Sequence, residues 1–143
     1  MKRLRISAQL RERVSRTARF SCGYCLTSQR VVGPLLEIDH ILPASQGGTS
    51  KERNLWLACP LCNSYKADRV ASLDPVTNVV VSLFNPREDR WSDHFEWTDG
   101  GTVIVGRTPV GRATALALNV NEPDVVAARR LWVTAGWHPP HDT

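Results

Sequence analysis

The chain has 143 residues, of which 42% are hydrophobic and 22% charged, and its formal net charge is +4. This length and composition predict one folded globular domain and exclude a disordered chain. No apolar run approaches the roughly 20 residues of a membrane span, which excludes an integral membrane protein. The basic N-terminus is not followed by the apolar segment of a secretory signal, so we expect a cytoplasmic protein.

Residues 7–20 predict an amphipathic basic helix. Its apolar positions recur at near-helical spacing: Leu10, Val14 and Ala18. Residues 1–30 hold eight of the 18 basic residues and a single acid, Glu12. Such an excess of positive charge suits the phosphates of a polyanion, although a merely solvated helix face is the alternative. The side chains we expect to make these contacts are Arg11, Arg13 and Arg16.

The four cysteines form two C-x-x-C pairs, "CGYC" and "CPLC": Cys22, Cys25, Cys59 and Cys62. Two such pairs have the spacing of a tetrahedral zinc site. Disulfides are the alternative, but without a secretion signal a reducing compartment is favoured, and a thioredoxin-like role needs only one pair. Four thiolates leave no open coordination position, so we expect this zinc to stabilise the fold and not to catalyse.

The segment between the two cysteine pairs predicts short elements joined by a long loop. "VVGPLLEID" reads as one bent strand or two short strands broken at Gly33-Pro34, and "PASQGGTSKERN" reads as a loop. The apolar "LWLAC" leads into the second cysteine pair. Pro60 then suits the first turn of a helix over "PLCNSYKADR".

The sequence pattern changes after residue 74. "VVVSLF", "HFEWT" and "TVIVGRT" predict strands, the last two joined by a "DGG" hairpin, and "GRATALAL" predicts a short helix. A final helix is predicted from an Asn121 cap to Gly136. The five tryptophans are expected to pack in the core. We therefore divide the chain into 1–74 and 75–143 and expect the two parts to form one compact domain.

The region between the cysteine pairs also contains an ordered set of polar residues. The set is "EIDH", then "GG", then "NL", then "CNSYK", with Asp39 and His40 adjacent where a strand ends. Burying both without partners is costly, which favours a chemical role. Over about residues 20–70, this order resembles the HNH family of nucleases.

The resemblance implies an α+β fold: a ββα-metal finger with a four-cysteine zinc site, preceded by a basic helix and followed by a small β-hairpin and helices. It implies hydrolysis of DNA phosphodiester bonds to a 5′-phosphate and a 3′-hydroxyl. His40 would be the general base, since a neutral imidazole suits that role. Asp39 and Asn63 would be oxygen ligands of a catalytic Mg²⁺ or Mn²⁺ ion. Asn54 would brace the loop.

Three points stay open in this comparison. The family name expects a third-position histidine, whereas this chain has Asn63, which shifts the expected metal towards Mg²⁺. Glu37 is a partner of the ligands, a minor ligand or an exposed strand residue. Lys66, one helical turn after Asn63, is expected to face the phosphate.

Two functions of other classes compete with the DNA endonuclease. One is a catalytically silent, zinc-stapled module that binds nucleic acid. The other is an adaptor that binds proteins through the tryptophan-rich C-terminal half. That half resembles a tail found in a bacterial subgroup of small HNH endonucleases, and none of its histidines forms a convincing ligand set.

Overall fold

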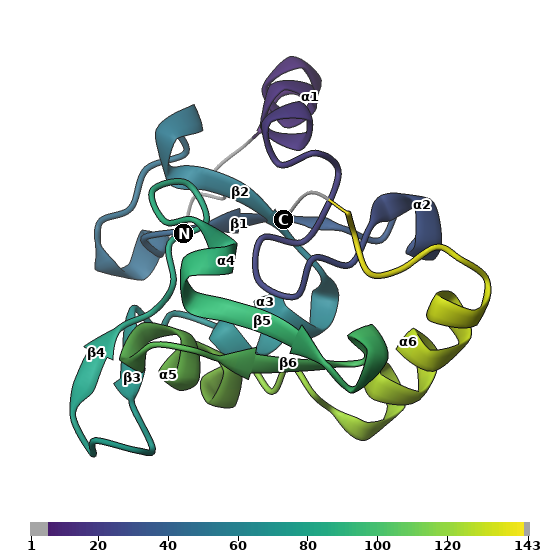
Figure 1. Cartoon of the computed structure of the whole chain (residues 1–143). Coiled ribbons are helices and arrows are strands. Elements are labelled where there is room, and N and C mark those ends of the chain that lie inside the picture. The colour runs from purple at the N-terminus through teal and green to yellow at the C-terminus, as the bar shows by residue number, and fades with distance from the viewer. Residues whose placement is uncertain (1–5, 142–143) are drawn as a thin grey trace. The chain divides into compact units, whose positions relative to one another are not determined.

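The structure, a computed structural model, describes residues 6–141. These residues divide after Val70 into two compact units, which we call unit 1 (6–70) and unit 2 (71–141). Both units combine short helices with two-stranded antiparallel sheets, one in unit 1 and two in unit 2. The mixed α+β class is therefore confirmed (Figure 1). Within the described residues, no helix has the length and apolar character needed to cross a lipid bilayer.

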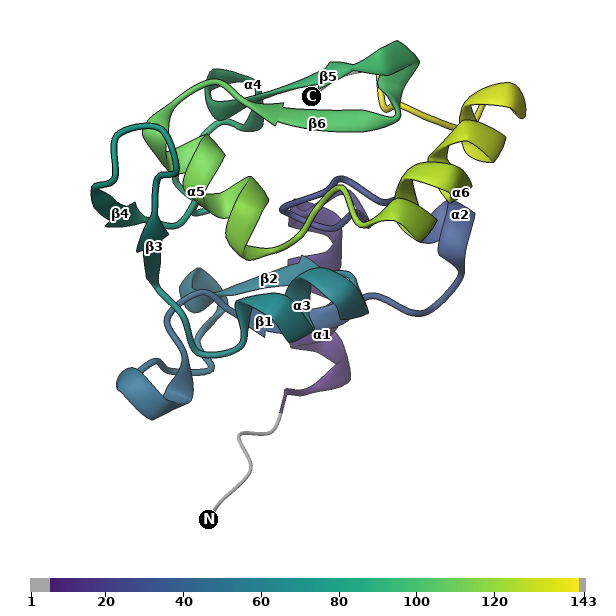
Figure 2. The ribbon, with the colours of Figure 1, turned by 90° about the horizontal axis from the view of Figure 1, so that it is seen from below.

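Unit 1 is built around one ribbon of two short strands. Its elements are α1 (Ala8–Thr17), α2 (Gln29–Val32), β1 (Glu37–His40), η1 (Ala44–Gln46), η2 (Glu52–Asn54), β2 (Leu55–Ala58) and α3 (Pro60–Lys66). β1 pairs with β2 so that Glu37 lies opposite Ala58 and His40 opposite Leu55. α1 and α3 lie on opposite faces of this ribbon (Figures 1 and 2).

The two longer helices of unit 1 begin at side-chain caps, as their sequences predict. Ser7 accepts a hydrogen bond from the Leu10 N–H at the start of α1, and the buried Val14 lies on the face that packs near β2. Cys59 caps α3, and Pro60 occupies its first turn. Because α1 buries only one narrow face, its remaining surface stays free to carry arginines.

The prediction of strand for "VVGPLLEID" is wrong for its first residues. Residues 29–32 form the single-turn helix α2, since the Ser28 hydroxyl accepts a hydrogen bond from the Arg30 N–H. Gly33 ends this turn with φ of +73°, a conformation that favours glycine. Only the last part of the predicted strand, from Glu37, forms β1.

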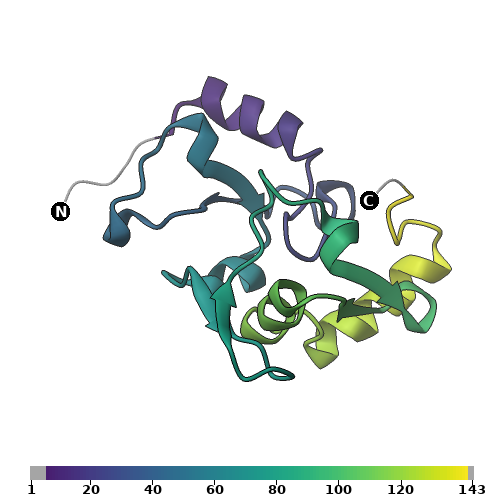
Figure 3. The ribbon, with the colours of Figure 1, turned by 60° about the vertical axis from the view of Figure 1, so that its left-hand side comes forward.

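Unit 2 contains two hairpins and three helices. Its elements are β3 (Ala71–Leu73), β4 (Val80–Ser82), α4 (Trp91–His94), β5 (Phe95–Thr98), η3 (Asp99–Gly101), β6 (Val103–Gly106), α5 (Pro109–Ala117) and α6 (Pro123–Thr134). β3 pairs with β4 and β5 with β6. α5 packs against both hairpins (Figures 2 and 3).

Two details of unit 2 differ from the sequence prediction. β3 was not predicted; it pairs with β4 across a turn in which Asp74 accepts backbone hydrogen bonds. The cap of α6 is Glu122, and not Asn121. The Asn121 amide instead bonds both backbone groups of Ile104 on β6, a long-range contact that a local capping rule cannot detect. Gly136, with φ of +81°, follows the end of α6 as predicted.

Aromatic side chains form much of the core of unit 2. Phe95 contacts Phe84 at a ring-centroid distance of 5.2 Å and Trp91 at the same distance, and Trp97 lies 5.5 Å from Trp91. Trp91 thus packs in the core as expected. Trp137 does not, because 64% of it is exposed.

Candidate functional site

The side chains of the four cysteines of unit 1 form one cluster. Their Sγ atoms all lie within 4.8 Å of one another, and those of Cys25 and Cys59 are 3.6 Å apart. An ion with tetrahedral bonds of about 2.3 Å to sulfur holds its ligands about 3.8 Å apart, so the cluster has the size that zinc requires. All four are free thiols, and disulfide sulfurs would be only about 2.0 Å apart.

Backbone hydrogen bonds hold both cysteine turns in place. The Gly23 N–H donates to the Leu57 carbonyl at 2.9 Å, which joins the first turn to β2. In the second turn, the Cys62 N–H donates to the Cys59 Sγ at 3.4 Å. An N–H that points at sulfur stabilises a thiolate, so this turn is preorganised for a metal ligand.

The ionisation of the thiols also fits a bound cation. Burial raises the pKa of the Cys22 thiol, and hydrogen bonding with Cys22 raises that of Cys62. Hydrogen bonds from Cys22 and the other thiols lower the pKa of Cys25. Burial and the contacts among the thiols thus oppose full ionisation of the cluster when no cation is present. A metal ion that binds four thiolates must displace the remaining protons, so its affinity falls as pH falls.

Asp39 lies on the face of β1 that meets α3. It is only 2% exposed, its Oδ2 accepts from the Tyr24 hydroxyl at 2.6 Å, and its Oδ1 accepts from the Lys66 Nζ at 3.1 Å. Burial and the charge of Asp39 raise the pKa of Tyr24, which keeps the phenol protonated as a donor. We expected Lys66 to face a phosphate; its ammonium, also 2% exposed, contacts Asp39 and the His40 carbonyl at 2.9 Å.

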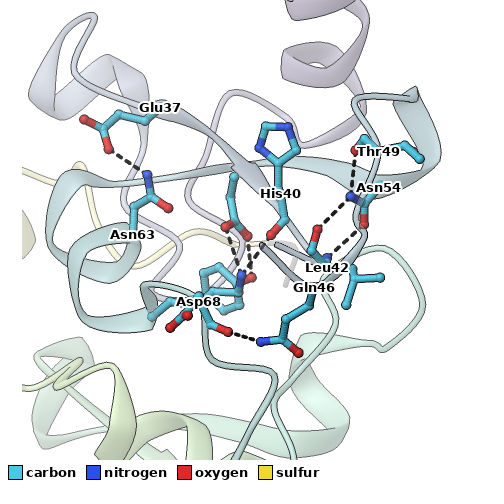
Figure 4. Close-up of polar contacts among 11 residues, drawn as sticks. Glu37, His40, Leu42, Gln46, Thr49, Asn54, Asn63 and Asp68 are labelled. Atoms are coloured by element: carbon cyan, nitrogen blue, oxygen red, sulfur yellow. Dashed lines mark hydrogen bonds and ion pairs between the residues drawn. The ribbon is translucent and has the colours of Figure 1, made fainter. Parts of the chain in front are cut away.

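His40 follows Asp39 on the strand, so its side chain points to the other face of β1. Figure 4 shows its ring turned away from Asn63. The Nε2 atom lies 2.9 Å from the Ser50 Oγ, and the residue is half-buried. With its carbonyl held by Lys66 and its ring held by Ser50, the imidazole has a fixed orientation and keeps contact with solvent.

Asn54 closes the loop that follows β1. Its Oδ1 accepts from the Leu42 N–H at 2.8 Å, and its Nδ2 donates to the carbonyls of Leu42 and Thr49 at 2.9 and 2.8 Å (Figure 4). The loop needs both of its glycines. Gly47 has φ of +89°, and a Cβ on Gly48 would overlap the Leu42 carbonyl. Asn54 therefore holds the loop beside His40 and is not among the hydrogen-bond partners of the Asp39 carboxylate, which are Tyr24 and Lys66.

Glu37 and Asn63 form a second link between β1 and α3. The Asn63 Nδ2 donates to the Glu37 Oε1 at 2.9 Å, and Figure 4 shows the amide oxygen turned away from that carboxylate. Glu37 lies two residues before Asp39, on the same strand face, and is exposed. The Glu37 and Asp39 carboxylates and the Asn63 amide thus lie between β1 and α3, and oxygens of these types are the donors that Mg²⁺ and Mn²⁺ prefer.

The arginines of α1 lie on the surface. Arg13 pairs with Glu52 at 2.9 Å and Arg16 with Glu12 at 2.9 Å, and all four side chains are at least 40% exposed. Arg11 donates to the carbonyl of the residue before β1 at 2.7 Å. Exposed ion pairs of this kind are weak, so a polyanion can compete for these arginines.

Comparison with known proteins gave one match. Residues 22–69 match the model of the HNH endonuclease family. The matched part covers both cysteine pairs and all the polar residues between them, and it is about a third of the chain. It confirms the resemblance inferred from the sequence motifs, and we call residues 22–69 the HNH segment. Neither the curated proteins nor the solved structures gave a match.

Two contacts of the HNH segment were not predicted from sequence. Tyr24 lies inside the first cysteine turn, and no local pattern indicates that it reaches Asp39. Ser50 follows the glycine pair without any signal that it contacts His40. The alternation of a strand was the one usable signal, because it puts Glu37 on the face of Asp39.

Proposed function

We propose that the HNH segment makes this protein a metal-dependent endonuclease that hydrolyses DNA phosphodiester bonds, with a structural zinc ion on the four thiols. The observation that supports this best is the surroundings of His40. A half-buried imidazole whose ring is held by Ser50 lies at the end of β1, and Asp39, the preceding residue on the strand, turns its carboxylate to the opposite face, towards α3. The family of the HNH segment consists of nucleases.

In this proposal, His40 takes the proton from the attacking water. A neutral imidazole is the natural base at physiological pH. If the Nε2–H donates to the Ser50 Oγ, then Nδ1 carries the lone pair that accepts the proton. Ser50 holds the ring orientation, and Asn54 keeps the adjoining loop in place.

Asp39 and Asn63 are the proposed ligands of a catalytic Mg²⁺ or Mn²⁺ ion. They fit such an ion because each carboxylate oxygen of Asp39 accepts one hydrogen bond and retains a further lone pair, while the Asn63 amide oxygen is turned away from Glu37. A bound ion would neutralise charge on the phosphate and stabilise the leaving oxygen. The arginines of α1 would bind neighbouring phosphates.

One observation favours a second candidate, a nucleic-acid-binding module without activity. The ammonium of Lys66 neutralises the carboxylate of Asp39 in a buried site, which reduces the attraction for a divalent cation. The two functions differ in whether a divalent ion other than zinc has any effect on DNA.

Plasmid cleavage separates the two candidates. We expect nicking or cutting with Mg²⁺ or Mn²⁺, none with EDTA, and a loss of about 10² to 10⁴ in rate for His40→Ala. Binding of DNA in EDTA should not change in this variant. The matched control is His94→Ala in unit 2, a histidine whose Nδ1 lies 2.7 Å from the Thr108 Oγ1. A wild-type protein that binds DNA but never cuts it would support the second candidate, and a fully active His40→Ala would exclude His40 as the base.

A further inference from the structure

We propose, on the basis of the divalent-ion site proposed above, that Glu37 is a positioning residue of that site. Its carboxylate holds the Asn63 amide in the orientation that leaves the amide oxygen free for the ion. The contact that carries this role is the 2.9 Å hydrogen bond from the Asn63 Nδ2 to the Glu37 Oε1 (Figure 4).

An asparagine ligand needs such a partner because its amide has two different ends. A half-turn of the side chain exchanges the oxygen, which can bind a cation, for the NH₂ group, which cannot. An ionised carboxylate only accepts hydrogen bonds, so it bonds the NH₂ end and excludes the reverse orientation. Partners of this kind orient metal ligands in many proteins, and their loss typically lowers metal affinity about 10- to 100-fold.

The position of Glu37 in the fold suits this role. Strand alternation puts Glu37 and Asp39 on one face of β1, and the three-residue spacing of Asn63 and Lys66 puts both on the facing side of α3. Each acid thus meets its own partner, and Asp39 is engaged by Lys66. Glu37 is exposed, so its hydrogen bond contributes little to folding, which makes a purely structural purpose a poor explanation.

A direct-ligand role for Glu37 is the alternative, because its exposed carboxylate lies on the same face of β1 as Asp39. The atom 2.9 Å from the Glu37 Oε1 is the Asn63 amide nitrogen, so an ion shared by the two side chains would require that amide to turn. Two neutral substitutions of equal length distinguish the roles. Glutamine keeps an acceptor oxygen for the Asn63 NH₂ group but loses the charge, whereas methionine loses both.

The experiment measures Mn²⁺ binding to the full-length, zinc-loaded protein without DNA, from the electron paramagnetic resonance signal of free Mn²⁺. We expect Glu37→Gln to stay within a few-fold of wild type and Glu37→Met to bind about 10- to 100-fold more weakly. The matched controls are Glu12→Gln and Glu12→Met on α1, where neither change should affect binding. Zinc content and melting temperature establish that each variant is folded.

Three outcomes would overturn the proposal. Equal weakening by Gln and Met would mean that the charge of Glu37 itself binds the ion. Wild-type affinity in Glu37→Met would mean that the contact is only a surface hydrogen bond, and absence of Mn²⁺ binding to the wild type would mean that there is no ion to position. Plasmid cleavage by the wild type is measured separately. If Glu37→Gln and Glu37→Met differ in Mn²⁺ affinity as expected but the wild type does not cut DNA, the proposed nuclease activity is refuted and the role of Glu37 is not.

Discussion

The two units differ in what holds them together. The buried residues of unit 1 include three thiols and the Asp39–Lys66 ion pair beside a few aliphatic side chains. Unit 2 has a core of aromatic and aliphatic side chains from both hairpins and α5. Even its fully buried Arg129 is bonded to main-chain carbonyls, those of Thr102 and Val120, at 3.0 and 2.6 Å.

This difference shows how a small unit compensates for short elements. β1 and β2 have four residues each, and so small a ribbon cannot bury the apolar area that a stable domain needs. The four-thiol cluster, which could hold a metal ion, and the polar pairs between β1 and α3 are the features of unit 1 that can supply the missing stability. Unit 2 has its own apolar core and should not depend on metal.

The largest expected effect is loss of the zinc site. Cys59→Ser should unfold unit 1 and leave unit 2 folded, because a structural zinc contributes about 10–16 kcal/mol in peptides, as much as the whole stability of a typical domain, about 5–15 kcal/mol. Hydrogen exchange resolved by peptide should show lost protection before residue 70 and retained protection after it. Chelation and zinc restoration in the wild type are the controls. Equal loss of protection in both units would show that they fold as one.

The next largest effect should come from the buried ion pair. Lys66→Met leaves the Asp39 carboxylate buried without its cation, which typically costs about 3–5 kcal/mol. Replacing both partners, as in Asp39→Leu with Lys66→Met, should restore part of that loss, although the Tyr24 hydroxyl then lacks its acceptor. Urea unfolding of zinc-loaded protein measures both. A double variant no more stable than Lys66→Met would mean that the pair is not the source of the effect.

A smaller effect is expected for the ion pair of unit 2. Asp74 is fully buried and accepts from the Arg112 Nε and Nη2 at 2.9 Å each, and this contact holds the pKa of Asp74 well below its usual range. A lowered pKa stabilises the fold above the unfolded value of about 3.9 and loses that contribution as pH falls. Asp74→Asn should therefore lower the melting temperature of unit 2 at neutral pH. The difference from wild type should shrink below about pH 4, and a constant difference would contradict the assignment.

The smallest effect on stability is expected for the surface arginines. Replacing Arg11, Arg13 and Arg16 with glutamine should leave the melting temperature nearly unchanged but weaken DNA binding. If all three contact phosphates, the slope of log affinity against log salt should fall by about 2–3 units. The matched control replaces three exposed arginines of unit 2 with glutamine: Arg90, Arg107 and Arg130. If the control variant loses as much DNA affinity, α1 is not the specific DNA-binding surface.

The sequence alone determined the basic helix α1, the helix α3 and the four-thiol cluster. Two C-x-x-C pairs specify a four-thiol cluster through local turns, helical spacing of apolar residues specifies α1, and an N1 proline specifies the start of α3, because these signals act within a few residues. The order of Asp39, His40, Asn54 and Asn63 was enough to indicate the family.

Only the tertiary structure decided how these residues pair. Lys66 meets Asp39, Tyr24 reaches the same carboxylate, and Asn121 bonds β6 in place of capping α6. These contacts join residues 15 to 27 positions apart, and no local propensity encodes them. Glu37 was ambiguous for the same reason: its partner on α3 is 26 residues away. For Asp39 and Lys66 the physical cause is burial, since a charge enclosed by folding must find a partner wherever the chain brings one.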